Sequence, residues 1–140
     1  MPIIKDGTTL KAINYNGTSI KKVIYNGTVV FKAEITVNWS IYIFASDTGI
    51  YIEFGATLAD TEPLSPSDVV TFRMDDIQDH NGNNLEVNLT IAQPTATMRT
   101  TVSIISTTLQ FLVNGVLKAT STWSPPSREG RRNGSVTFEP

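Results

Sequence analysis

Hydrophobic and polar residues alternate along most of the chain, which is the pattern of β-strands with one buried face. The alternation is strict from Ile35 to Ile43 and again from Ile50 to Ala56. Further strands are predicted at residues 69–74, 85–91, 98–105, 108–113, 116–122 and 135–138. No stretch has the 3.6-residue period of an amphipathic helix. With turns about every eight to twelve residues, this pattern predicts an all-β protein in which residues 34–140 form an Ig-like antiparallel β-sandwich of about seven or eight strands.

The N-terminal segment repeats one phrase. Residues 10–18 (LKAINYNGT) align with residues 20–28 (IKKVIYNGT), and a fainter copy lies at residues 3–8. Asn-Gly between alternating apolar residues is a strong hairpin signal, because a type I′ turn needs positive φ at both central positions. The repeat therefore predicts successive tight hairpins.

Two such turns predict a three-stranded β-ribbon over residues 1–33. Two-residue loops would place Tyr15 opposite Thr18 and Val23 opposite Val30. Three short strands bury too little apolar surface to be stable alone. We therefore expect the ribbon to pack on the rest of the chain or on another chain, and assign it as an anchor or assembly element.

Composition excludes several classes of function. The 140 residues include no cysteine, so a disulfide framework, a thiolate zinc site and a cysteine nucleophile are excluded. The first residues lack the apolar core of a secretory signal. The longest uncharged run, residues 100–117, carries Thr, Ser, Gln and Asn throughout, which argues against a membrane span. We expect a soluble protein without membrane insertion.

Charge is segregated along the chain. Residues 1–33 hold five Lys against one Asp, whereas residues 34–99 hold ten acidic residues against two Arg. A basic patch is one route to nucleic-acid binding. The lysines are few, however, and solvated strand faces account for them, so we expect no nucleic-acid partner.

The most polar stretch, residues 75–86, carries alternating oxygen ligands at Asp79, Asn81 and Asn83. Such groups suit a hard cation such as calcium. The spacing departs from the calcium-loop template, because Gly82 stands where that loop has a variable residue and the bidentate acid is misplaced. A turn whose polar side chains satisfy the backbone is the simpler interpretation, and no metal is predicted.

His80, the only histidine, lies inside the same turn. A histidine–carboxylate pair could act as a general base. No nucleophile elbow and no zinc-binding histidine motif accompanies it. We therefore expect an exposed turn histidine, no catalytic residue, no cofactor and no enzyme activity.

Arg128, Arg131 and Arg132 lie in a Gly- and Pro-rich stretch, residues 124–134, which is predicted to be a long loop before the last strand. Guanidinium forks in a loop can hold a carboxylate, a phosphate or an acidic surface. This is the only basic cluster in the second half of an acidic body. It is therefore a candidate for an intersubunit contact.

Aromatic residues on a sandwich face can hold carbohydrate. Trp39 falls in register with Ile35, Val37 and Ile41, which predicts a core position. Tyr42 and Tyr51 fall on the opposite register and are the candidates for contact with a glycan. Cross-strand pairing on a half-exposed sheet explains these two residues equally well.

Two segments carry a resemblance to a known class of proteins. Residues 16–31 (NGTSIKKVIYNGTVVF) resemble a segment recurrent in small tail, baseplate and fibre-associated virion proteins of tailed bacteriophages. Residues 79–83 (DHNGN), between two strands, resemble turns of Ig-like domains on phage and bacterial surfaces. The resemblance implies that the ribbon attaches to the particle through Lys11, Lys21, Lys22 and its exposed backbone edges.

These observations predict a structural or accessory virion protein, made in the host cytoplasm, that forms homo-oligomers and contacts other virion proteins. The expected assembly residues are Lys11, Tyr15, Lys21, Lys22, Tyr25, Phe31, Arg128, Arg131 and Arg132. The alternative function is a carbohydrate- or cell-surface-binding module that uses Tyr42 and Tyr51. The two can both hold, since a displayed sandwich can bind a host glycan.

Overall fold

The computed structural model describes residues 4–5, 8–9, 13–15, 18–20, 22–25 and 28–140. The β-strands among these residues all pair antiparallel. The six short N-terminal strands are β1 (Ile4–Lys5), β2 (Thr8–Thr9), β3 (Ile13–Tyr15), β4 (Thr18–Ile20), β5 (Lys22–Tyr25) and β6 (Thr28–Lys32). The longer strands are β7 (Ile35–Ser46), β8 (Gly49–Leu58), β9 (Val70–Gln78), β10 (Asn84–Leu89), β11 (Thr95–Val102), β12 (Thr108–Val113), β13 (Val116–Thr122) and β14 (Glu129–Phe138).

The N-terminal strands form three separate two-stranded hairpins, β1–β2, β3–β4 and β5–β6. The predicted pairing of Tyr15 with Thr18 is confirmed. The continuous three-stranded ribbon stays a prediction, because its central strand would run through Lys21, which lies outside the described residues. Val23 lies opposite Phe31 instead of Val30, owing to an irregularity in the ladder between Val23 and Ile24.

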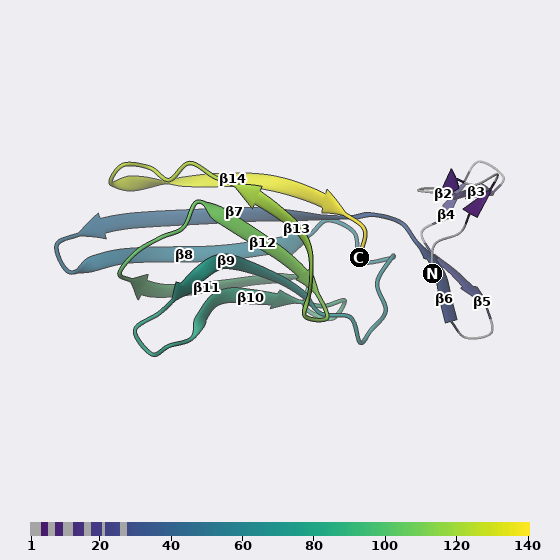
Figure 1. The fold of residues 1–140 in the computed structure, drawn as a ribbon, viewed down its shortest axis with the longest axis horizontal. Coiled ribbons are helices and arrows are strands. Elements are labelled where there is room, and N and C mark those ends of the chain that lie inside the picture. Colours follow the sequence, from purple (N-terminus) through teal and green to yellow (C-terminus); the bar gives the residue numbers. More distant parts are fainter. Residues whose placement is uncertain (1–3, 6–7, 10–12, 16–17, 21, 26–27) are drawn as a thin grey trace.

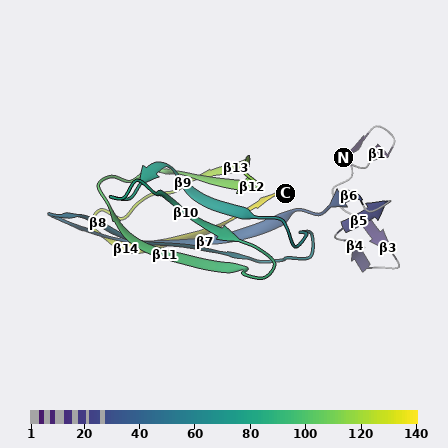
Figure 2. The same cartoon turned by 90° about the horizontal axis from the view of Figure 1, so that it is seen from below.

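Strands β7–β14 form two four-stranded sheets that pack face to face as a β-sandwich (Figure 1). One sheet has the order β11-β8-β7-β14 and the other has the order β10-β9-β12-β13. Figure 2 shows the two layers from the side. The predicted all-β class with two antiparallel sheets is confirmed. The described residues contain no helix, and hence none of the length and hydrophobicity needed to cross a membrane.

The last strand begins earlier than the sequence predicts. Residues 129–134 belong to β14, which pairs with β7 along its whole length, from Glu129 opposite Phe44 to Phe138 opposite Ile35. The predicted long loop thus ends at Arg128, and Arg131 and Arg132 lie on a strand. Gly and Asn are poor strand formers, but here the backbone ladder with β7 overrides local propensity.

The core between the sheets is built from inward positions of the long strands, with β13 contributing only the partly buried Ala119. Trp39 is buried as predicted, together with Ile35, Val37 and Ile41. Four aromatic rings form its centre: Phe72 stacks on Phe54 with 4.3 Å between ring centroids and lies 5.2 Å from Phe111 and 6.3 Å from Trp39. This filled core places the remaining side chains of each sheet on its outer side.

Candidate functional site

The candidate site lies on the side of the sheet β11-β8-β7-β14 that faces away from the core, here called the outer face. Because strand residues alternate between faces, burial of Ile41 and Phe54 turns their neighbours Tyr42 and Glu53 outward. The predicted outward register of Tyr42 and Tyr51 is therefore what the structure shows. The ladder places Tyr42 directly opposite Glu53 on β8.

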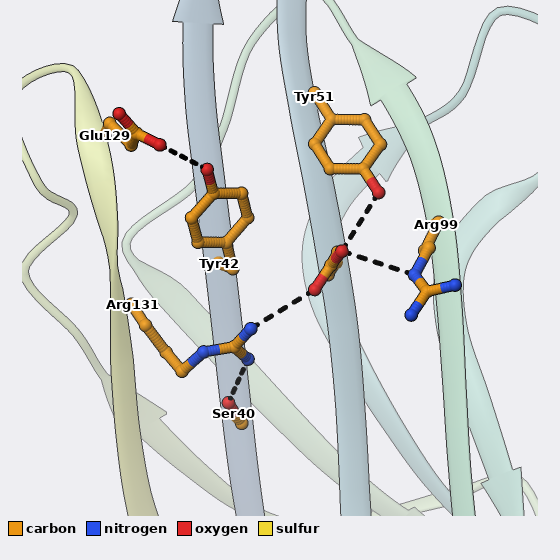
Figure 3. A network of polar contacts seen from close by, with 7 residues as sticks. Ser40, Tyr42, Tyr51, Arg99, Glu129 and Arg131 are labelled. Atoms are coloured by element: carbon orange, nitrogen blue, oxygen red, sulfur yellow. Dashed lines mark hydrogen bonds and ion pairs between the residues drawn. The ribbon is translucent and has the colours of Figure 1, made fainter.

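Glu53 is the centre of a polar network on the outer face (Figure 3). Its carboxylate accepts a hydrogen bond from the Tyr51 hydroxyl at 3.0 Å. It also forms ion pairs with Arg99 of β11 at 3.3 Å and with Arg131 of β14 at 3.2 Å. One carboxylate thus connects β8 to the two edge strands of the sheet.

Arg131 is held by three groups. Besides Glu53, it donates a hydrogen bond to the Ser40 hydroxyl at 2.9 Å, and its guanidinium carbon lies 5.5 Å from the centroid of the Tyr42 ring. A cation placed over an aromatic face in this way is attracted by the ring quadrupole. The Tyr42 hydroxyl in turn donates to Glu129, so Tyr42 holds Arg131 in place (Figure 3).

The contacts of the network shift the pKa values of Glu53, Tyr42 and Tyr51. The hydrogen bond from Tyr51 and the two guanidinium groups lower the pKa of Glu53 below its ordinary value, so that its carboxylate is ionised. The bond to Glu129 raises the pKa of Tyr42, and loss of hydration raises that of Tyr51. Glu53 is therefore a hydrogen-bond acceptor, and the two tyrosines keep their hydroxyl protons.

A hollow of about 130 Å³ lies beside this network on the outer face. Gly55, at an outward position of the central strand β8, is one of the residues that line it. Glu53 and Arg131 line one side. The remaining outward-facing residues that line it are Asn38, Ser40, Thr57, Thr95 and Thr97.

The three arginines predicted for an intersubunit contact lie in different surroundings. Arg131 is part of the network with Tyr42 and Tyr51, and its place in an intersubunit contact stays a prediction. Arg128 lies in the loop before β14, where its carbonyl accepts a hydrogen bond from the Ala45 amide at 2.8 Å. The Arg132 side chain donates to the carbonyl of Arg131 at 3.1 Å and takes no part in the network.

The N-terminal assembly residues are placed only in part. Tyr15 lies on β3, Lys22 and Tyr25 lie on β5, and Phe31 lies on β6. Lys11 and Lys21 are outside the described residues. The role of these six residues in assembly stays a prediction.

Sequence reasoning missed Glu53, Ser40, Arg99 and the hollow. One signal was present: Gly55 interrupts an otherwise alternating strand at an outward position. A glycine inside a strand often marks a close approach of a ligand or of another backbone. Ala at this position would place a Cβ only 2.8 Å from Oγ1 of Thr97, so the residue is closely surrounded on one side.

In the turn at residues 79–83, a side chain of the turn provides hydrogen bonds for the backbone amides. The Asp79 carboxylate accepts hydrogen bonds from the amides of Asn81 and Asn83, at 2.9 and 3.0 Å, and these bonds lower its pKa. Gly82 has a φ of 82°, as such a turn requires. His80 is exposed in this turn. Among the residues that the structure describes, no three His, Asp or Glu side chains are arranged to hold a metal ion.

The outer face and its hollow thus define a β-sandwich with a polar, partly aromatic surface site. Comparison of the chain with protein-family models, with curated proteins and with solved structures gave no match.

Proposed function

We propose that this protein is a structural or accessory component of a tailed-phage virion, which assembles through its N-terminal segment and displays its sandwich. The observation that carries the proposal is the division of the described N-terminal residues into separate two-stranded hairpins. Such hairpins are marginal in water, and their unpaired edges can accept strands from copies of the chain or from other virion proteins. The resemblance of residues 16–31 to phage virion proteins supports the same assignment.

The strand order supports an Ig-like assignment for the displayed domain. In an Ig constant domain the first, second and fifth strands share one sheet, and the third, sixth and seventh share the other. Here β7, β8 and β11 share one sheet and β9, β12 and β13 share the other. Two strands differ: β10 joins the second sheet, and β14 is added beside β7.

Light scattering tests the assembly proposal on the full chain and on a chain that begins at Ala33. We expect the full chain to have a mass that is a multiple of 15.3 kDa and the shorter chain to be a folded monomer. The buried residues of the part whose burial the structure describes, residues 33–140, run from Ile35 to Phe138, so the shorter chain keeps them. Near-ultraviolet circular dichroism of the tryptophans checks that fold.

A full chain with Lys11, Lys21 and Lys22 changed to Gln distinguishes association through lysine charge from association through strand pairing. If backbone edges carry the association, this variant stays oligomeric; if the lysines carry it, the mass falls toward that of a monomer. Monomeric behaviour of both the full and the shorter chain would contradict self-assembly through the N-terminal segment. Absence of the protein from purified phage particles would contradict the virion assignment.

A second candidate function is binding of carbohydrate at the outer face, and the network around Glu53 favours it. Exposed ion pairs contribute only about 0–1 kcal/mol each to stability, so stability gives little reason for holding Arg131 with Glu53, Ser40 and Tyr42. An ordered set of donors and acceptors beside two aromatic rings suits a sugar, whose hydroxyls need polar partners and whose C–H faces pack on rings. Repeated copies on a particle would strengthen weak binding through avidity.

Immobilised glycans tested against the full chain and three variants address this function. We expect Tyr42→Ala and Tyr51→Ala to weaken binding by about tenfold or more, since about 1.4 kcal/mol of lost contact is tenfold in affinity. Tyr42→Phe keeps the ring under Arg131 and is expected to retain most of the binding. Equal loss in the Phe and Ala variants of Tyr42 would contradict the role of its ring, and no binding by the unchanged chain would contradict the function.

A further inference from the structure

We propose that the hollow above Gly55 binds a single residue of an uncharged carbohydrate. This inference rests on the carbohydrate-binding function proposed above and names its site and ligand class. Three properties of the hollow carry it: the chemistry of its lining, its size and its balance of charge.

The lining consists of short groups that both donate and accept hydrogen bonds. Ser40 and Thr97 present hydroxyls, and Asn38 presents an amide. Thr57 and Thr95 are joined hydroxyl to hydroxyl at 3.0 Å. Sugar hydroxyls are likewise donors and acceptors, so they can pair with the protons and lone pairs that these groups still offer beyond their bonds within the protein.

The volume sets the size of the ligand. A volume of about 130 Å³ is several times the about 10–15 Å³ that a single water molecule needs. It is well below the about 300–1,000 Å³ of sites that enclose drug-sized ligands. A single sugar ring, seated in the hollow with the rest of the glycan over the sheet, fits this size.

The charge of the outer face selects a neutral ligand. Its outward charged residues on β8, β11 and β14 are two acids, Glu53 and Glu129, and two bases, Arg99 and Arg131. A carboxylate in the hollow would meet Glu53, and an ammonium group would meet Arg131. Arg131 uses two of its nitrogens for Ser40 and Glu53, and a guanidinium carries five N–H groups in all, so donors remain for a sugar hydroxyl.

Tyr42 acts in this site as a positioning residue. Its ring lies under the Arg131 guanidinium and its hydroxyl is bound to Glu129. The Tyr51 ring meets it edge to face, with centroids 6.3 Å apart and planes at 70°. The two rings therefore fix the side of the hollow on which Arg131 and Glu53 offer their polar atoms.

Amide chemical shifts of the ¹⁵N-labelled full chain test the proposal. The probes are the methyl glycosides of glucose, galactose and mannose, with glucuronate and glucosamine as acidic and basic counterparts. We expect at least one neutral probe to shift the amides of Gly55, Thr95 and Thr97 with millimolar affinity, and to bind better than both charged probes. Absence of shifts at these amides, or tighter binding of a charged probe, would overturn the proposal.

A pair of matched variants locates the contact. Thr97→Val removes a hydroxyl from the hollow, and Thr137→Val removes one from the same face on the other edge strand, where Thr137 bonds Thr36 at 2.8 Å. We expect Thr97→Val to weaken binding of the neutral probe about three- to tenfold, the loss of one hydrogen bond, and Thr137→Val to leave it unchanged.

The two proposals fail in different ways. If both variants bind the glycan equally while Tyr42→Ala abolishes binding, the outer face binds carbohydrate but the hollow does not hold it. If the unchanged chain binds no immobilised glycan and no monosaccharide, the carbohydrate-binding function itself is wrong.

Discussion

Replacement of Phe72 by Ala is expected to lower the free energy of unfolding by about 3–5 kcal/mol. Phe72 is fully buried and comes from β9, yet its ring stacks on Phe54 of the opposite sheet at 4.3 Å and 3° between planes. It also contacts the rings of Phe111 and Trp39. Its truncation removes contacts to both sheets and leaves a cavity between rigid rings that cannot close on it.

Urea denaturation measures this change. Since domains of this size have about 5–15 kcal/mol of stability, the variant would lose a large part of it, and the midpoint would fall while the slope with urea stays the same. Phe44→Ala is the matched control, because Phe44 lies on the outer face with 37% of its surface exposed. A smaller loss, about 1 kcal/mol, is expected there, because more than a third of the side chain is already in water and its removal leaves no internal cavity. Similar losses in the two variants would show that Phe72 does not hold the sheets together.

Replacement of Gly134 by Ala is expected to destabilise the protein by about 1–3 kcal/mol, the usual effect of overpacking. A Cβ on Gly134 would lie 2.7 Å from Cζ2 and 2.8 Å from Cε2 of Trp39. The indole cannot swing away easily, because it is 94% buried and stacked on Phe72. Without this contact the same change would stabilise the protein by about 0.4–1 kcal/mol, so the sign of the effect is the test.

A double-mutant cycle assigns the effect to Trp39. Trp39→Phe removes the ring atoms that the new methyl would meet, so Gly134→Ala is expected to cost less in that background, with a coupling of about 0.5 kcal/mol or more. The indole Nε1 is buried without a hydrogen-bond partner, so its removal also relieves an unsatisfied donor. Asn133→Ala, on the exposed side of the same strand, is the control. Stabilisation by Gly134→Ala would contradict the predicted clash.

The core and the candidate site are two faces of the same strands. Trp39 and Ile41 pack inward while Ser40 and Tyr42 between them face outward. Strands β7 and β8, fixed by the buried rings, thereby hold Ser40, Tyr42 and Glu53 at set positions. Binding sites built on strands are more precise than sites built on loops. We therefore expect core variants that fold to retain the arrangement of the outer face.

The sequence by itself determined those features that depend on local periodicity. The two-residue period of apolar and polar positions predicted the class of fold, the core position of Trp39 and the outward register of Tyr42 and Tyr51. The repeated Asn-Gly predicted the pairing of Tyr15 with Thr18. Each of these follows from the direction of neighbouring side chains along one strand or from the chemistry of one turn.

Only the tertiary structure decided which strands lie side by side. The strand start at Glu129 depends on the backbone ladder with β7, because the Gly and Asn residues of this segment favour a loop. The network brings together Ser40, Glu53, Arg99 and Arg131, which four different strands supply. Contacts between residues so far apart in the chain depend on strand order, and strand order is fixed by how the two sheets bury their apolar faces against each other.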